Sequence, residues 1–110
     1  MDVTYLYALA EPTRFRIVEL LRERPLAVNE IAEALDLRQP QASKHLRYLA
    51  KSGIVTMRPA AQQRIYTLRA EPFINLGEWA HSFERQWQDK LNNLDKYLDT
   101  MKKGESYDSN

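Results

Sequence analysis

Hydrophobic side chains recur at helical spacing through the first half of the chain. The pattern predicts four helices, at residues 3–9, 12–22, 28–35 and 40–51. Pro12 and Pro40 suit the first turns of the second and fourth helices, because proline has no N–H to leave unpaired there. Residues 36–38 are interpreted as a tight turn. Ser52 and Gly53 end the fourth helix, with Gly53 as its left-handed cap.

A change of pattern follows the fourth helix. Residues 54–58 and 64–68 are rich in β-branched and aromatic side chains, which favours strands, and residues 59–63 predict a longer loop between them. From residue 72 to about 102 the apolar spacing predicts one long helix. The polar residues 104–110 predict a disordered tail. We therefore expect a single domain over residues 1–103 that is mainly α-helical with a small β-hairpin.

This order of elements is typical of a winged helix-turn-helix fold. The short third helix, the turn and the fourth helix form a helix-turn-helix over residues 28–51, and the hairpin over residues 54–68 is its wing. The fourth helix is then the element that enters the DNA major groove. The helix over residues 72–102 is expected to be a C-terminal dimerisation helix.

The distribution of charge agrees with that interpretation. The net charge is only +1, from 16 Lys and Arg against 15 Asp and Glu. Residues 38–69 nevertheless hold seven cations and no acid, so the rest of the chain has a balance of −6. An acid-free basic segment favours a polyanionic partner, since no nearby carboxylate competes with phosphate. An uneven but merely solvated surface is the simpler alternative.

Candidate DNA contacts follow from a helical wheel of the fourth helix. Ala42, Leu46 and Leu49 cluster on one side, and the cationic side chains point away from them. Glutamine amides can pair with adenine, and Arg or Lys with guanine, while polar side chains on the wing reach phosphates or the minor groove. The predicted DNA-binding residues are Arg38, Gln39, Gln41, Ser43, Lys44, His45, Arg47, Lys51, Arg58, Gln62, Gln63 and Arg64.

The terminal helix carries an apolar stripe. A helix of about 30 residues is roughly 45 Å long, more than a small domain can cover. We expect the stripe to pair with its own copy across a two-fold axis, and packing on the same domain or a pocket for a small apolar effector are the alternatives. The predicted dimer residues are Leu6, Tyr7, Trp79, Phe83, Trp87, Leu91, Leu94 and Leu98.

Five segments, in order, resemble the ArsR/SmtB family of regulators. They are AEPTR with IVELL (residues 10–21), EIAEAL (30–35), QPQASKHLRYL (39–49), SGIV (52–55) and RIYTL (64–68). The resemblance implies a dimeric winged-helix repressor of transcription. Two recognition helices related by a two-fold axis then predict that its operator in duplex DNA is an inverted repeat. Two positions depart from the family pattern, because Ala27 and Arg38 stand where Ser or Thr would cap a helix, a loss of about 1 kcal/mol each. The wing tip is also less basic than the family's.

Other classes of function find little support. The chain has no cysteine, so the thiolate metal sites found in metal-sensing relatives are impossible. His81 is the only histidine of the terminal helix, with Glu78 and Glu84 three residues away on either side, whereas a zinc site takes three or four ligands, usually with more than one histidine. A site shared between two copies in a symmetric dimer stays an alternative. No catalytic constellation is evident, and no cofactor is expected. A sensor repressor and a winged helix that docks protein remain the alternative functions. We expect no signal peptide, no membrane span and a cytoplasmic location.

Overall fold

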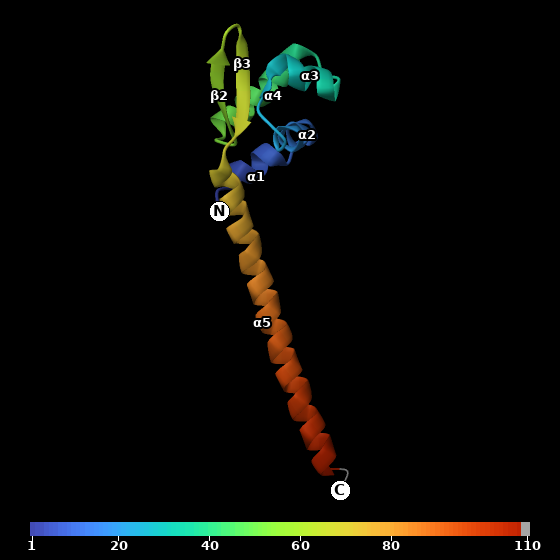
Figure 1. The fold of residues 1–110 in the computed structure, drawn as a ribbon. Coiled ribbons are helices and arrows are strands. Elements are labelled where there is room, and N and C mark those ends of the chain that lie inside the picture. The colour runs from blue at the N-terminus through green and yellow to red at the C-terminus, as the bar shows by residue number, and fades with distance from the viewer. Residues whose placement is uncertain (109–110) are drawn as a thin grey trace. The chain divides into compact units, whose positions relative to one another are not determined.

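The structure is a computed structural model that describes residues 1–108, with side chains through residue 103. It divides into two compact units that part after Ile74, and each is described by itself. The first holds seven short elements and the start of the last helix (Figure 1). In chain order the elements are α1 (Val3–Leu9), α2 (Pro12–Leu21), β1 (Leu26–Ala27), α3 (Val28–Leu35), α4 (Gln39–Lys51), β2 (Val55–Ala60), β3 (Gln63–Leu68) and α5 (Ala70–Asp108).

The core of the first unit is built from α2, α3, α4 and the start of the wing. Its largest fully buried aliphatic side chains are Ile17, Ile31, Leu46, Leu49, Ile54 and Val55. Burying one such side chain contributes roughly 1.5–3 kcal/mol, so these residues fix the helix-turn-helix in place. The wheel prediction for the fourth helix is confirmed, because Ala42, Leu46 and Leu49 are all completely buried.

The sheet has three antiparallel strands in the order β1-β3-β2, rather than a hairpin alone. The extra strand, β1, pairs Leu26 with Tyr66 and Ala27 with Ile65. Two residues are too few to show an alternating pattern, which is why the sequence did not predict this strand. Its pairing joins the start of α3 to the wing.

The hairpin loop is shorter than we expected. The strands pair from Val55–Leu68 to Ala60–Gln63, so only residues 61 and 62 form the turn, and the expected loop over 59–63 is wrong. Pro59 suggested a loop, but β2 is an edge strand, where a missing N–H breaks no ladder on a second side. Ala61 has a positive φ of 56°, a conformation that favours glycine.

Several hydrogen bonds fix the chain where α4 ends and β2 begins. Gly53 has a φ of +82°, which confirms the left-handed cap. The Ile54 N–H donates to the Leu49 carbonyl at 2.9 Å. Nη1 of Arg69 donates to the Gly53 carbonyl at 2.9 Å, and its Nη2 lies 2.9 Å from Oε2 of Glu71. Of the seven cations in the basic segment, Arg69 is therefore a structural residue.

Both helices of the helix-turn-helix start without a side-chain cap at the N-cap residue. Ala27 and Arg38 occupy those positions, as expected, and neither side chain caps its helix. The third residue of each helix compensates in part. Glu30 Oε1 accepts the N–H of Ala27 at 3.0 Å, and Gln41 Oε1 accepts the N–H of Arg38 at 3.1 Å. Half of a capping box is thus present at each start.

The second unit is the helix α5 beyond residue 74. The helix begins two residues before the expected 72–102 and extends to Asp108, so the expected tail over 104–110 overlaps its last residues. Residues 109–110 lie outside the described residues. The six predicted stripe residues on α5 are 41% to 62% exposed. Among the described residues, no helix is both long and apolar enough to cross a membrane.

Candidate nucleic-acid interface

The exposed side of α4 is cationic and free of acids. Lys44, Arg47 and Lys51 are all exposed, opposite the buried apolar side of the helix. Among the side chains that the structure describes, none of these three, nor Arg38, Arg58 or Arg64, forms an ion pair. Unpaired cations keep their full attraction for phosphate, because no carboxylate neutralises them first.

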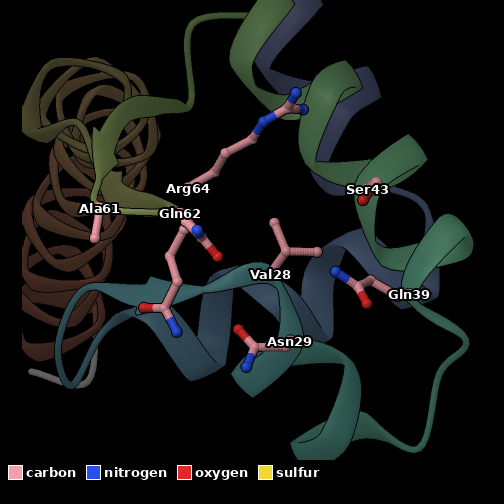
Figure 2. Close-up of a pocket in the computed structure, with 8 residues that line it drawn as sticks. Val28, Asn29, Gln39, Ser43, Ala61, Gln62 and Arg64 are labelled. Atoms are coloured by element: carbon pink, nitrogen blue, oxygen red, sulfur yellow. The ribbon is translucent and has the colours of Figure 1, made fainter.

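A groove of about 790 Å³ lies between the helix-turn-helix and the wing tip. Figure 2 shows side chains from the starts of α3 and α4 and from the wing around it. Five predicted DNA-binding residues meet here, and three further residues, Val28, Asn29 and Ala61, line the groove without having been predicted. The lining consists of Val28, Asn29, Gln39, Ser43, Ala61, Gln62, Gln63 and Arg64.

Asn29 is the polar residue that the sequence analysis missed. It is exposed at the second position of α3 and faces the same groove as Gln39 of α4 (Figure 2). The first helix of a helix-turn-helix crosses the DNA backbone near its start. A polar, exposed side chain in the first turn of α3 was therefore the signal that could have identified it.

The wing does not present its two arginines on one face. Arg58 pairs with Ile65 and Pro59 pairs with Arg64, so the two arginines sit at alternating positions of the ladder. Directly paired residues share a face and neighbouring pairs point to opposite faces. Arg64 therefore lies on the face of the groove, and Arg58 on the other face of the hairpin.

Gln41 has one of its two amide functions already engaged. Its Oε1 accepts the Arg38 N–H, which leaves the Nε2 hydrogens as its free donors. Bidentate pairing with adenine needs both the carbonyl oxygen and the amide nitrogen. The oxygen has a second lone pair, so its bond to the Arg38 N–H holds the Gln41 amide in place without preventing that pair.

His45 lies on the side of α4 that faces α2. Its ring Nδ1 is 3.7 Å from Oε2 of Glu11, and the two side chains are only 22% and 33% exposed. Glu11 is the N-cap of α2 and its Oε2 accepts the Arg14 N–H at 2.8 Å. Burial raises the pKa of Glu11, but hydrogen bonds from the backbone of Arg14 and Thr13, with the charges of His45 and Arg14, lower it below its usual value overall.

The alternative of a metal sensor finds few ligands close together within one chain. Nδ1 of His81 lies 3.2 Å from Oε2 of Glu84, one helical turn away on α5. In the part of the chain whose side chains are described, no group of three or more His, Asp or Glu residues is placed to hold a metal ion.

Comparison with known proteins identifies relatives of the first unit. A family profile described as a helix-turn-helix domain matches residues 9–58. The transcriptional regulator Rv2034 of Mycobacterium tuberculosis is 46% identical over 61 residues, which are 56% of this chain and 57% of that protein. The transcriptional repressor SmtB of the same species is 41% identical over 63 residues, 57% of this chain and 47% of SmtB. The chain thus matches about half the length of these relatives.

The similarity to solved structures covers a larger part of this chain than the sequence matches do. A crystal structure of an ArsR family transcriptional regulator matches with a TM-score of 0.71 at 28% identity, over 77% of this chain and 93% of that one. HlyU from Vibrio cholerae matches with a TM-score of 0.63 at 33% identity, over 74% and 88%. A homodimeric winged helix-turn-helix DNA-binding domain from Mycobacterium bovis matches with a TM-score of 0.63 at 27% identity, over 74% and 76%. These matches bear out the predicted fold, and the chain belongs to the ArsR/SmtB family of winged helix-turn-helix transcriptional regulators.

Proposed function

We propose that this chain is a sequence-specific transcriptional repressor that binds an inverted-repeat operator in duplex DNA as a homodimer. The observation that carries the proposal is the side of α4 with Lys44, Arg47 and Lys51, which is exposed and unpaired. It stands in an acid-free segment of a near-neutral chain. Such a surface is attracted electrostatically to the phosphate backbone of DNA more strongly than to most protein surfaces.

The groove beside α4 supports separate roles for its residues, some contacting bases and others phosphates. With the start of α4 in the major groove, Gln39 and Ser43 face base edges or the adjoining backbone. Asn29 and Arg64, on the other walls, are placed to hold phosphates. Phosphate contacts fix the register of the protein on DNA, and only the base contacts carry sequence information.

The apolar stripe on α5 supports the homodimer. Six large apolar side chains between Trp79 and Leu98 are each at least 41% exposed in the single chain. Contiguous exposed apolar surface of this kind marks an interaction site, and a second copy offers the same stripe in return. Tyr7, at 67% exposed, and the half-buried Leu6 stay predicted additions from α1. The related domain from Mycobacterium bovis is itself homodimeric.

A salt titration of duplex binding tests the proposal. If a dimer neutralises roughly eight phosphates, the logarithm of the binding constant falls with the logarithm of salt concentration at a slope near −7. Lys44→Ala should make that slope shallower by about 2 per dimer, since each subunit loses one phosphate contact. Lys96→Ala on α5 is the matched control and should leave the slope unchanged. A flat salt response of the wild-type protein would refute the proposed function.

A further inference from the structure

One arginine joins three helices of the first unit. From α2, the Arg14 Nε donates to the Ala8 carbonyl at 2.7 Å, and Nη2 donates to the Tyr7 carbonyl at 3.1 Å. The same guanidinium lies over the ring of Tyr48 on α4, with Cζ 4.1 Å from the ring centroid. The last carbonyls of α1 and one face of α4 are thus held by a single planar group.

The guanidinium suits both contacts at once. The final carbonyls of a helix have no intrahelical donor, and a cation there also meets the negative end of the helix dipole. The in-plane N–H groups of Arg14 give the Ala8 carbonyl a donor and the Tyr7 carbonyl a second one beside the Ala10 N–H, and they leave the flat face of the guanidinium free to stack on an aromatic ring. Lysine offers no such plane, so it cannot make both contacts in this geometry.

Tyr48 stands next to the DNA-facing cations. It directly follows Arg47 and comes one helical turn after Lys44, and its side chain is 44% exposed. The stack with Arg14 is therefore a contact on the outer part of α4, whereas the buried Leu46 and Leu49 hold the inner side. Such a contact resists rotation of the helix about its own axis, which the apolar core alone resists less.

We propose that Arg14 is a positioning residue that sets the orientation of α4 relative to α1 through Tyr48. The inference rests on the proposed function, because α4 is the helix that would read the operator. α1 also carries Leu6 and Tyr7 of the predicted dimer surface, and Arg14 binds the carbonyl of Tyr7 itself. The rotation of each recognition helix is thereby tied to the helix that the second copy would contact.

The test compares operator binding with nonspecific binding in a small set of variants. Tyr48→Leu removes the ring, Tyr48→Phe keeps it without the hydroxyl, and Arg14→Lys keeps the charge without the plane. The operator is the duplex selected by the wild-type protein from a random pool, and a scrambled duplex measures nonspecific binding. Thermal unfolding and sedimentation of each variant check folding and dimerisation.

The expected losses follow from the strength of a cation–π contact. An exposed pair is worth about two- to fivefold per subunit, so a dimer with Tyr48→Leu should lose about 4- to 25-fold in operator affinity. Nonspecific affinity, which depends on phosphate charge more than on helix orientation, should change by less than about twofold. Tyr48→Phe should bind as the wild type does. Arg14→Lys should lose at least as much operator affinity as Tyr48→Leu. The double variant should bind the operator about as tightly as the single variant with the lower affinity, because both changes break the same contact.

Three results would overturn the inference while leaving the proposed function intact. They are an equal loss in Tyr48→Phe, which would make the hydroxyl a DNA contact; additive losses in the double variant; and a folded Tyr48→Leu dimer with unchanged operator affinity. If Arg14→Lys does not fold, the comparison of Tyr48→Leu with Tyr48→Phe still decides. A wild-type protein that selects no duplex at all would instead refute the proposed function.

Discussion

The His45 ring on α4 lies 3.7 Å from the carboxylate of Glu11, the residue that caps α2. The carboxylate accepts the Arg14 N–H at 2.8 Å, so one side chain both starts α2 and touches the recognition helix. Burial raises the pKa of Glu11, and the backbone donors of Arg14 and Thr13 together with the charges of His45 and Arg14 outweigh it, so the pKa lies below its usual value of 4.5.

Glu11 should therefore make stability depend on pH in the acid range. A carboxylate whose pKa is depressed by folding contributes stability above its unfolded pKa, and that contribution is lost as the pH falls through the folded value. Glu11→Gln should lower the free energy of unfolding by about 1 kcal/mol at pH 7, as loss of an N-cap does. The difference from the wild type should shrink as the pH is lowered below 4.5.

Urea unfolding at pH 7, 5, 4 and 3 measures this difference. Glu23→Gln, at an exposed position just after α2, is the control and should behave as the wild type at every pH. A gap between Glu11→Gln and the wild type that stays constant from pH 7 to pH 3 would show that the carboxylate charge contributes nothing.

The sequence predicted most of the helices because their signals are local. The bounds of α1 and α3 agree with the prediction to the residue, since apolar spacing defines each helix and Asp2, Ala10, Ala27 and Asp36 flank them without extending it. Gly53 was identifiable as a left-handed cap because it follows a helix and no other residue type takes that conformation as easily.

What the sequence could not predict depends on partners distant along the chain. β1 exists because Leu26 pairs with Tyr66, 40 positions later. The groove at the wing tip forms because Asn29 and Arg64 are brought together by that same sheet. The sequence placed His45 among the predicted DNA contacts, but only the fold could show that Glu11 lies 3.7 Å from its ring.

Base recognition should separate from phosphate binding in single variants of α4. Arg47→Ala should relax preference at one or two operator positions and cost roughly 1–3 kcal/mol. Gln41→Ala should do the same, and it also removes the oxygen that accepts the Arg38 N–H. Lys51→Ala, at the last residue of α4, should weaken all sequences about equally. Binding to a panel of singly substituted operators measures each effect, and unchanged specificity in a triple Gln41, Lys44 and Arg47 to Ala variant would exclude α4 as the reading helix.

The turn at the wing tip should tolerate, and benefit from, a glycine. Ala61 has a φ of 56° at the first position of a two-residue turn, where a Cβ is strained. Ala61→Gly should raise the free energy of unfolding by up to about 1 kcal/mol, less the extra entropy of glycine in the unfolded chain. Ala60→Gly, in the adjoining strand position, is the control and should destabilise. A loss of stability in Ala61→Gly would show that the turn is not strained.

Metal ions should not govern DNA binding. The chain has no cysteine, and His81 is the only histidine on α5. Chelators should therefore leave operator affinity unchanged, and zinc at about micromolar concentration should not release the operator, since a zinc site needs three or four ligands. Fluorescence anisotropy with and without each agent measures this. Release by zinc that disappears in His81→Ala would establish a site shared between two copies.

Dimerisation through α5 should be required for specific binding. Trp87 is 62% exposed in the middle of the stripe, and burying one large apolar side chain is worth roughly 1.5–3 kcal/mol, so six per subunit would dominate an interface of this kind. Trp87→Glu places a charge where desolvation is costly, so the variant should sediment as a monomer. A monomer has only one recognition helix, so it should lose operator binding, because two half-sites about 34 Å apart need two helices, while some nonspecific affinity remains.

Asn92→Glu is the control, because it adds the same charge about 140° around the helix, and it should stay dimeric. Sedimentation and operator binding on the same samples decide the matter. A folded, monomeric Trp87→Glu that binds a full operator with normal affinity would contradict the prediction, as would a wild-type protein that is monomeric at about micromolar concentration.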